Sequence, residues 1–414
     1  MQITKAFPAL IGLLFLSSTS FAQNHWVASW GSAPMQANNP KPLDATITVR
    51  NIVHLSIGGT ALRIVISNQY GAEPLLIDGA SVAESDPGSK GALKPASSPL
   101  RITFSGKSTL SIPAGEQSVS DPVQLPTRPL EDLAVSLLLP AQKLTAFTQH
   151  VASHATNYTA AGDQLMQPAL QNPTAVTPWH FLRSVSVLAP TQAGALVCFG
   201  DSITDGTGST ANANSRWPDI LSAWFQSQGE NPATAVLNEG IGGNRILHDG
   251  NGPAALTRYA HDVLSQDGVR SVIILEGIND IARTNAAFPE AYQPVTAADI
   301  IAGLNTLLTQ GHARGLKVYA GTLTPYFGSK YYYAGGEQMR LTVNTFIRQS
   351  KSFDGVVDFD HLLADPANPQ ALLPAYEHGD HLHPSDAGYR VMAEGVENAL
   401  FRHAVRPAHE NAKH

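Results

Sequence analysis

The stretch VCFGDSITDGTG occupies residues 197–208, close to the middle of the chain. Apolar residues lead into Gly200-Asp201-Ser202, where the polarity changes abruptly. A short apolar run that ends in glycine and polar residues is typical of a buried strand followed by a turn. The sequence therefore predicts a strand whose carboxyl end presents Ser202.

The region around and after this strand alternates between strand-like and helix-like patterns. Strand-like runs cover 195–200, 234–241, 271–277, 316–323 and 355–360, and helix-like stretches cover 217–229, 254–266, 297–315, 337–350 and 385–401. In the stretch 297–315, apolar residues repeat along one helix face at Ile300, Ile301, Leu304, Leu307 and Leu308. The alternation predicts an α/β fold, in three α/β/α layers around a doubly wound, mostly parallel sheet. Ligands of such sheets bind at the carboxyl ends of the strands, where Ser202 is expected.

The region before residue 190 has a different pattern. Short strand-like runs at 45–59, 60–71, 100–106 and 131–141 are separated by Gly, Pro, Asn and Asp, and no stretch has a convincing helix pattern. This predicts an all-β, sandwich-like domain of antiparallel strands. We therefore expect a β domain over 23–190, an α/β domain over 191–405 and a short tail over 406–414.

The N-terminus has the features of a secretory signal. Lys5 precedes an apolar run from about Ala9 to Leu16, and the small residues Ser20 and Ala22 come just before Gln23. This layout predicts a signal peptide over 1–22 that is cleaved after Ala22, and hence an exported protein, periplasmic or secreted. The alternative is an uncleaved membrane anchor, but the apolar run is shorter than the ~20 residues that a spanning helix needs. No later segment is predicted to span a membrane.

Composition narrows the possible partners. Hydrophobic residues make up 43% of the 414 residues and charged residues 14%, which is typical of a globular protein. The formal net charge is −7 and no long basic run occurs, so nucleic acid is not expected as a partner. The single cysteine, Cys198, excludes an internal disulfide and is expected to be a buried apolar residue.

No cofactor is expected from the sequence motifs, and none of them indicates an oligomeric state. The stretch SGKST at 105–109 resembles part of a phosphate-binding loop, but Arg101 stands where that motif requires its first glycine.

Four polar blocks follow predicted strands in the α/β region. A serine acts as a nucleophile only when a base can take its proton and donors can stabilise the developing oxyanion. After Ser202, the second block supplies glycines in LNEGIGGNRI (237–246), the third supplies Asn279 in LEGIND (275–280), and the fourth supplies Asp380 and His383 in HGDHLHPSDAGY (378–389). On a doubly wound sheet, all four blocks would meet at one edge.

These four blocks resemble those of the GDSL, or SGNH, hydrolase superfamily, in the order expected for that family. The resemblance covers about residues 195–401. It implies that Ser202 is the nucleophile, His383 the general base and Asp380 the group that orients the imidazole. It further implies an oxyanion hole formed by the backbone N–H groups of Ser202 and Gly243 and by the side-chain amide of Asn279. No Gly-x-Ser-x-Gly sequence occurs, because Thr204 stands two residues after the serine, and this argues against the α/β-hydrolase fold.

Two simpler interpretations compete with these roles. Ser202 could only cap the following helix, but that leaves the other three blocks unexplained. His378, His381 and His383 could bind a metal with Asp380, but no helical histidine pair supports such a site and no metal is expected. His381 is the histidine that we expect to take no part in the chemistry.

The substrate is indicated only by weaker signals. The stretch TPYFGSKYYYAGGEQ (324–338) follows the fourth strand, and Tyr326, Tyr331 and Tyr332 in it are expected to contact substrate, unless they simply pack under the loop. The stretches WVASWGSAP (26–34) and PWHFLRSVSVLAP (178–190) resemble a group of exported bacterial acylhydrolases or arylesterases with a β-rich domain before the catalytic one. Some members of that group remove acetyl groups from plant polysaccharides.

We therefore expect an exported serine esterase that acts on short acyl esters such as acetylated carbohydrates, with a small-molecule or polysaccharide ester as its partner. One alternative is an exported carbohydrate-binding protein whose hydrolase domain is idle. Another is a lipase or arylesterase that acts on small lipid or aryl esters. Because the junction at 178–190 is apolar, Trp179, Phe181 and Leu182 are expected in a rigid interface between the two domains.

Overall fold

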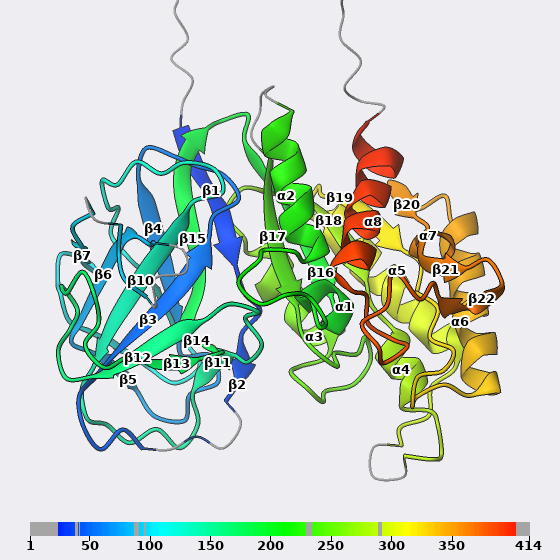
Figure 1. Cartoon of the computed structure of the whole chain (residues 1–414), viewed down its shortest axis with the longest axis horizontal. Helices are drawn as coiled ribbons and strands as arrows, with labels where there is room; N and C mark the ends of the chain where they lie inside the picture. Colours follow the sequence, from blue (N-terminus) through cyan, green and yellow to red (C-terminus); the bar gives the residue numbers. More distant parts are fainter. Residues whose placement is uncertain are drawn as a thin grey trace, which may run out of the picture.

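The computed structural model describes two regions that lie side by side, an all-β region and an α/β region (Figure 1). The described residues are 24–37, 40, 42–86, 91–94, 97–228, 234–288 and 292–402. The predicted signal peptide over 1–22 and the predicted tail over 406–414 lie outside the described residues. No helix in the described ranges is long and apolar enough to cross a membrane.

The first region, called the β half below, consists of antiparallel sheets, as predicted. One sheet contains β13 (Thr174–Val176), β12 (Asn157–Ala161), β3 (Ile47–His54), β10 (Asp132–Leu139), β6 (Gly79–Glu84) and β7 (Leu100–Ile102), in this order. A second contains β1 (Asn24–Gly31), β15 (Leu182–Pro190), β4 (Leu62–Ser67) and β9 (Gln117–Val119). Smaller sheets pair β14 (Trp179–His180) with β11 (Thr148–His150) and β2 (Met35–Gln36), and β5 (Leu75–Ile77) with β8 (Leu110–Ile112). Buried residues of both larger sheets, such as Val135 and Ile64, share one apolar cluster.

The second region, called the α/β half below, is built on a parallel sheet, which confirms the predicted fold class. Its strands run in the order β17 (Thr234–Gly240), β16 (Gly194–Gly200), β18 (Val269–Leu275), β19 (Lys317–Gly321) and β20 (Gly355–Val357). The helices are α1 (Ser202–Asp205), α2 (Trp217–Ser227), α3 (Ala255–Tyr259), α4 (Ile278–Ala282), α5 (Ala297–Ala313), α6 (Ala334–Gln349), α7 (Phe359–Leu363) and α8 (Asp386–Val396). Single π-turns at 260–264 and 397–401 extend α3 and α8, and a short hairpin joins β21 (Ala364–Asp365) to β22 (Asn368–Leu372).

Helices cover both faces of this sheet because its strands are apolar on both sides. Along β16, Leu196 and Cys198 belong to the apolar cluster that includes Trp217 of α2 and Met392 of α8. The alternate residues Val197 and Phe199 belong to the cluster that includes α5. This two-residue alternation is the pattern of a strand buried between two helical layers. Cys198 is fully buried, as expected.

Local signals place the helices as the sequence predicted. The helix α5 begins after Thr296, whose hydroxyl accepts a hydrogen bond from the Asp299 N–H while the Asp299 carboxylate accepts one from the Thr296 N–H. Such a reciprocal cap satisfies amide groups that the first turn leaves free. The apolar face of α5 is turned inward, with Ile300, Leu304, Leu307 and Leu308 buried.

The two halves share a core. The strand β1 of the β half packs against β17, and one buried cluster contains Val27 and Ala28 together with Ala235 and Leu237. Buried polar contacts also cross the boundary, since the Val236 N–H donates to Ser56 Oγ at 3.1 Å. The continuous core fixes how the β half sits against the sheet that carries the polar blocks.

The three junction residues expected in an interface have different surroundings. Trp179 lies at the boundary, with the Arg216 guanidinium of the α/β half 5.9 Å from its ring centre. Phe181 packs at a tilt against Phe147 within the β half and, like Trp179, also belongs to the apolar cluster shared by the two halves. Leu182 is buried in the shared apolar cluster.

Candidate active site

The position of Ser202 follows from the way β16 ends. Asp201 has an extended backbone and caps α1, because its carboxylate accepts a hydrogen bond from the Ile203 N–H at 2.9 Å. Ser202 is the first residue of this short helix and is 7% exposed. The alternative that Ser202 caps the helix is therefore wrong, since Asp201 has that role. The side chain of Ser202 is left available for another partner.

Ser202, His383 and Asp380 form one hydrogen-bonded chain. Ser202 Oγ lies 2.8 Å from His383 Nε2, and His383 Nδ1 lies 2.6 Å from Asp380 Oδ2. A carboxylate can only accept, so Nδ1 carries the proton and donates to Asp380. In the neutral imidazole, Nε2 is then the acceptor for the Ser202 O–H. This is the tautomer that a general base needs.

The Asp380 carboxylate is held by its own loop. Its Oδ1 accepts hydrogen bonds from the N–H groups of Leu382 at 3.0 Å and His383 at 2.9 Å. Partial burial raises the pKa of Asp380, but the hydrogen bonds from His383 and Leu382 outweigh it and hold the pKa below its usual value. Asp380 therefore stays ionised beside the imidazole.

The predicted oxyanion donors come from loops after neighbouring strands. Gly243 has a φ of +76°, a conformation that side-chain-bearing residues rarely adopt. The Gly242 N–H donates to Asp205 Oδ2 at 3.1 Å, whereas the Gly243 N–H donates to no other residue in the described part of the chain. Asn279 Nδ2 donates to the Asn244 carbonyl at 3.0 Å, and its second N–H remains available because an amide nitrogen has two.

Buried charges hold these loops together. Arg258 is 2% exposed and donates to the carbonyls of Gly200 and Glu239 and to Asn244 Oδ1, at 2.8–2.9 Å. It thereby ties the ends of β16 and β17 to the loop that contains Gly243. Asp280, next to Asn279, accepts hydrogen bonds from two N–H groups of the same loop. Neither residue stood out as a support of the site in the sequence, although Asp280 is the last residue of IND in the third block.

The β half supplies a second residue near the site that the sequence did not reveal. His150 of β11 lies 3.1 Å from Asp205 Oδ1 through Nε2 and 2.9 Å from the Ala33 carbonyl through Nδ1. The side chains of His150 and Asp205 are each 3% exposed. Asp205 is the last residue of α1, the helix that begins with Ser202. No local sequence signal could have paired these residues, which lie 55 positions apart.

The three tyrosines expected to contact substrate differ in how deeply they are buried. Tyr326 is fully buried in a small cluster with Ile278 and Leu382, so the expectation that its ring contacts substrate is corrected. The ring packs beneath the loops that carry Asn279 and His383. Tyr331 and Tyr332 are half-buried against this cluster, and the Tyr332 hydroxyl donates to Gln370 Oε1 at 2.7 Å. They remain candidates for substrate contact.

His381 has a different environment from His383. Its Nδ1 lies 2.7 Å from Glu377 Oε2, and about half of its side chain is exposed. Within the described ranges, no three His, Cys, Asp or Glu side chains converge in a way that could hold a metal ion.

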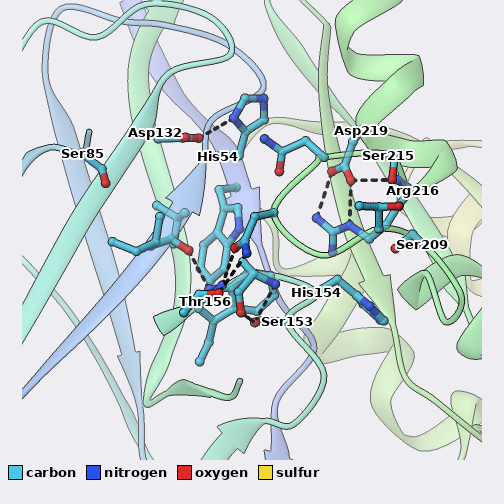
Figure 2. Close-up of a pocket in the computed structure, with 18 of the residues that line it drawn as sticks. His54, Ser85, Asp132, Ser153, His154, Thr156, Ser209, Ser215, Arg216 and Asp219 are labelled. Carbon is cyan, nitrogen blue, oxygen red and sulfur yellow. Dashed lines mark hydrogen bonds and ion pairs between the residues drawn. The ribbon is translucent and has the colours of Figure 1, made fainter. Parts of the chain in front are cut away.

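A cavity of about 210 Å³ lies between the two halves, apart from the chain of Ser202, His383 and Asp380 (Figure 2). His54 and Asp132 line it from the β half, and Arg216 and Asp219 line it from the α/β half. The pairs are in contact, with 2.6 Å between His54 Nδ1 and Asp132 Oδ1 and 2.7 Å between Arg216 Nε and Asp219 Oδ2. The described residues that line this cavity include none of Ser202, His383 and Asp380.

Comparison with known families places the four blocks in one family. The model of the GDSL-like lipase/acylhydrolase family matches residues 198–391. No curated protein sequence matches the chain significantly.

Several solved structures resemble the α/β half. A mutant of an acetylxylan esterase from Geobacillus stearothermophilus has 22% sequence identity and a TM-score of 0.40, covering 50% of this chain and 93% of its own. A GDSL-like lipase from Bacteroides thetaiotaomicron has 19% identity and a TM-score of 0.38, covering 49% and 86%. A carbohydrate acetylesterase family member from Sinorhizobium meliloti has 18% identity and a TM-score of 0.37, covering 50% and 96%.

Proposed function

Because the C-terminal half of the chain is a GDSL-like lipase/acylhydrolase domain, we propose that the protein is a serine esterase that hydrolyses carboxylic esters. The observation that carries this proposal is the hydrogen-bonded chain from Ser202 Oγ through the His383 imidazole to the Asp380 carboxylate. A serine with an acceptor nitrogen at 2.8 Å and a base oriented by a carboxylate has the geometry of an activated nucleophile.

The geometry supports a two-step acyl transfer. Ser202 Oγ attacks the ester carbonyl while His383 Nε2 takes its proton, and Asp380 stabilises the imidazolium that results. The N–H groups of Ser202 and Gly243 and the Asn279 amide would stabilise the tetrahedral oxyanion. As this intermediate collapses, the C–O bond to the alcohol breaks and His383 returns the proton to the leaving oxygen. Water then hydrolyses the acyl-serine by the same steps and releases the acid.

The proposed substrates are short acyl esters, such as acetylated carbohydrates. The protein would encounter them outside the cytoplasm. The stretches at 26–34 and 178–190 support this choice through their resemblance to exported acylhydrolases. Export itself rests on the signal expected at 1–22. The partial burial of Tyr331 and Tyr332 leaves part of each ring available to a substrate beside the site.

A substrate panel tests the proposal. Hydrolysis of aryl acetate, butyrate and octanoate and of acetylated oligosaccharides is measured for the wild-type protein and for Ser202→Ala, with the released acid identified. We expect wild-type activity that falls with acyl length and is lost in the variant. Equal, measurable rates for the two proteins would contradict Ser202 as the nucleophile. No hydrolysis of any ester by the wild-type protein would favour a carbohydrate-binding protein with an idle hydrolase domain.

A further inference from the structure

A groove of about 640 Å³ runs between the two halves. The β half contributes Met35 and Gln36 of β2, Tyr70 and the segment after β11. The α/β half contributes Asp205, Thr207, Gly242 and the loop 249–253. Figure 1 shows β2 on the side of the β half that faces the loops before α3, with which it lines this groove. Both halves are therefore needed to form this groove.

The groove ends at the loops of the candidate active site. The Thr207 N–H donates to the Ser202 carbonyl at 2.9 Å, so Thr207 is hydrogen-bonded to the residue that carries the predicted nucleophile. At Gly243, an added Cβ would lie 2.6 Å from Asn251 Nδ2, so the Asn251 amide packs beside the Cα of the residue that carries the predicted oxyanion donor. Because Thr207 and Asn251 both line the groove, the groove adjoins the loops that carry Ser202 and Gly243.

The walls of the groove disfavour an anionic occupant. The wall from the β half is largely apolar and includes Met35, Ala37, Pro40, Val151 and Ala152. The opposite wall carries the carboxylates of Asp205 and Asp249 and the amide of Asn251. Among the described residues that line the groove there is no Lys or Arg, so an anionic group would find carboxylates and no cation. A group with both apolar surface and hydroxyls fits the two walls.

His150 fixes the floor of this groove from the β half. Its ring nitrogens both face atoms that can only accept, the Ala33 carbonyl and Asp205 Oδ1, so each nitrogen donates and the ring is an imidazolium. Burial lowers the pKa of His150, but the charge and hydrogen bond of Asp205 outweigh it and raise the pKa. Asp205 Oδ2 in turn accepts the Gly242 N–H, one residue before the predicted oxyanion donor.

We propose that the β half completes the active site: the groove binds the uncharged alcohol part of the ester, and His150 positions the loop 242–243 against Ser202 through Asp205. This inference rests on the proposed esterase function. It assigns to His150 a positioning role, because it touches neither substrate nor reacting atoms.

The binding part of the proposal is tested with charges at the groove. Gln36 is exposed on β2, and we compare Gln36→Lys and Gln36→Glu on two esters of one acid, whose alcohol parts differ only in a terminal hydroxyl or carboxylate. The measured quantity is the ratio of kcat/KM for the carboxylate ester to that for the hydroxyl ester. Lysine should raise this ratio about three- to fivefold and glutamate should lower it, through KM, and both effects should shrink at high salt.

The matched controls are Gln228→Lys and Gln228→Glu. Gln228 is also exposed, but it follows α2 at the opposite end of the sheet from the carboxyl edge. Its variants should leave the ratio unchanged. Equal ratios for the Gln36 and Gln228 variants, in proteins that still hydrolyse both esters, would overturn the groove assignment alone. Absence of hydrolysis in the wild-type protein would instead contradict the esterase function.

The positioning part is tested with His150→Gln and the near-isosteric Asp205→Asn. His25→Gln is the control, because His25 also bonds across the boundary, to the Ala193 carbonyl at 3.0 Å, but away from the catalytic loops. On a small aryl acetate, a displaced oxyanion loop should lower kcat about tenfold or more in both test variants, with KM little changed. His25→Gln should stay within about twofold of wild type.

Thermal unfolding of all three variants separates positioning from stability. Loss of kcat in a folded Asp205→Asn protein supports the proposal even if His150→Gln fails to fold. Equal kcat for Asp205→Asn and His25→Gln would overturn it.

Discussion

Both halves bury apolar strands, yet only the α/β half brings the predicted catalytic residues together at one edge of a sheet. In its parallel sheet, the carboxyl ends of β16, β17 and β18 lie at the same edge, so Ser202, Gly243 and Asn279 follow neighbouring strands there. In the antiparallel sheets of the β half, successive strands end at opposite edges. The β half therefore supports the candidate active site through contacts across the boundary between the halves, above all the contact of His150 with Asp205. It adds no sequence motif of its own to that site.

The largest effect is expected when the two halves are separated. A chain that begins at Thr191 would expose the cluster in which Ala235 and Leu237 of β17 meet β1. Exposed apolar surface of this kind promotes aggregation, so we expect little soluble protein and no esterase activity. Size-exclusion chromatography and circular dichroism test this. A soluble, folded and fully active α/β half would show that the β half is an independent module.

Within the α/β half, the largest effect is expected at the nucleophile and base. Ser202→Ala and His383→Ala should each lower kcat by roughly 10³-fold or more, because the two groups act as a unit. The matched control is His381→Ala, two residues away, whose imidazole is bound to Glu377. It should retain most activity, and all three proteins should unfold at similar temperatures. Comparable losses for the two histidine variants would contradict the assignment of the base.

A smaller loss is expected at the oxyanion donor. Asn279→Ala should lower kcat about 10²- to 10³-fold with little change in KM, because the amide would bind charge that develops only in the transition state. Steady-state kinetics on an aryl acetate measure both constants. A large rise in KM with kcat preserved would instead make Asn279 a ground-state binding residue.

The smallest expected effect is on how the free energy of unfolding depends on pH. Burial raises the pKa of Asp201 to about 7, helped by the charge of Asp280 and opposed by the hydrogen bond from the Ile203 N–H. Since the folded pKa lies above the unfolded value of about 3.9, the folded state holds the proton longer, and this group's contribution to stability falls between about pH 4 and 7.

Asp201→Asn removes this titration while keeping an oxygen for the helix cap. Relative to wild type, its free energy of unfolding should therefore rise as the pH increases from about 4 to 7 and stay constant above. Urea unfolding at four pH values measures the difference. A difference that moves the opposite way would contradict the buried, protonated state of Asp201.

Sequence reasoning recovered what is encoded locally. The polar residues at strand ends located Ser202, Asp380 and His383, which the structure joins by hydrogen bonds, and the apolar periodicities located the strands and helices around them. The resemblance to the GDSL family singled out Gly243 and Asn279, whose roles stay predictions. The pairing of His150 with Asp205 is set by the packing of the two halves, so no spacing along the chain reveals it. The inward turn of Tyr326 was equally hidden, because its burial depends on Leu382 and Ile278 from other loops.

Covalent labelling shows directly whether Ser202 is an activated nucleophile. A phosphonate ester with a good leaving group forms a tetrahedral adduct that resembles the transition state of acyl transfer, and intact-mass and peptide mass spectrometry locate it. We expect one adduct per chain, on the peptide that contains Ser202, with activity lost in proportion and no adduct in Ser202→Ala. Labelling at another residue, or full esterase activity in Ser202→Ala, would contradict this expectation.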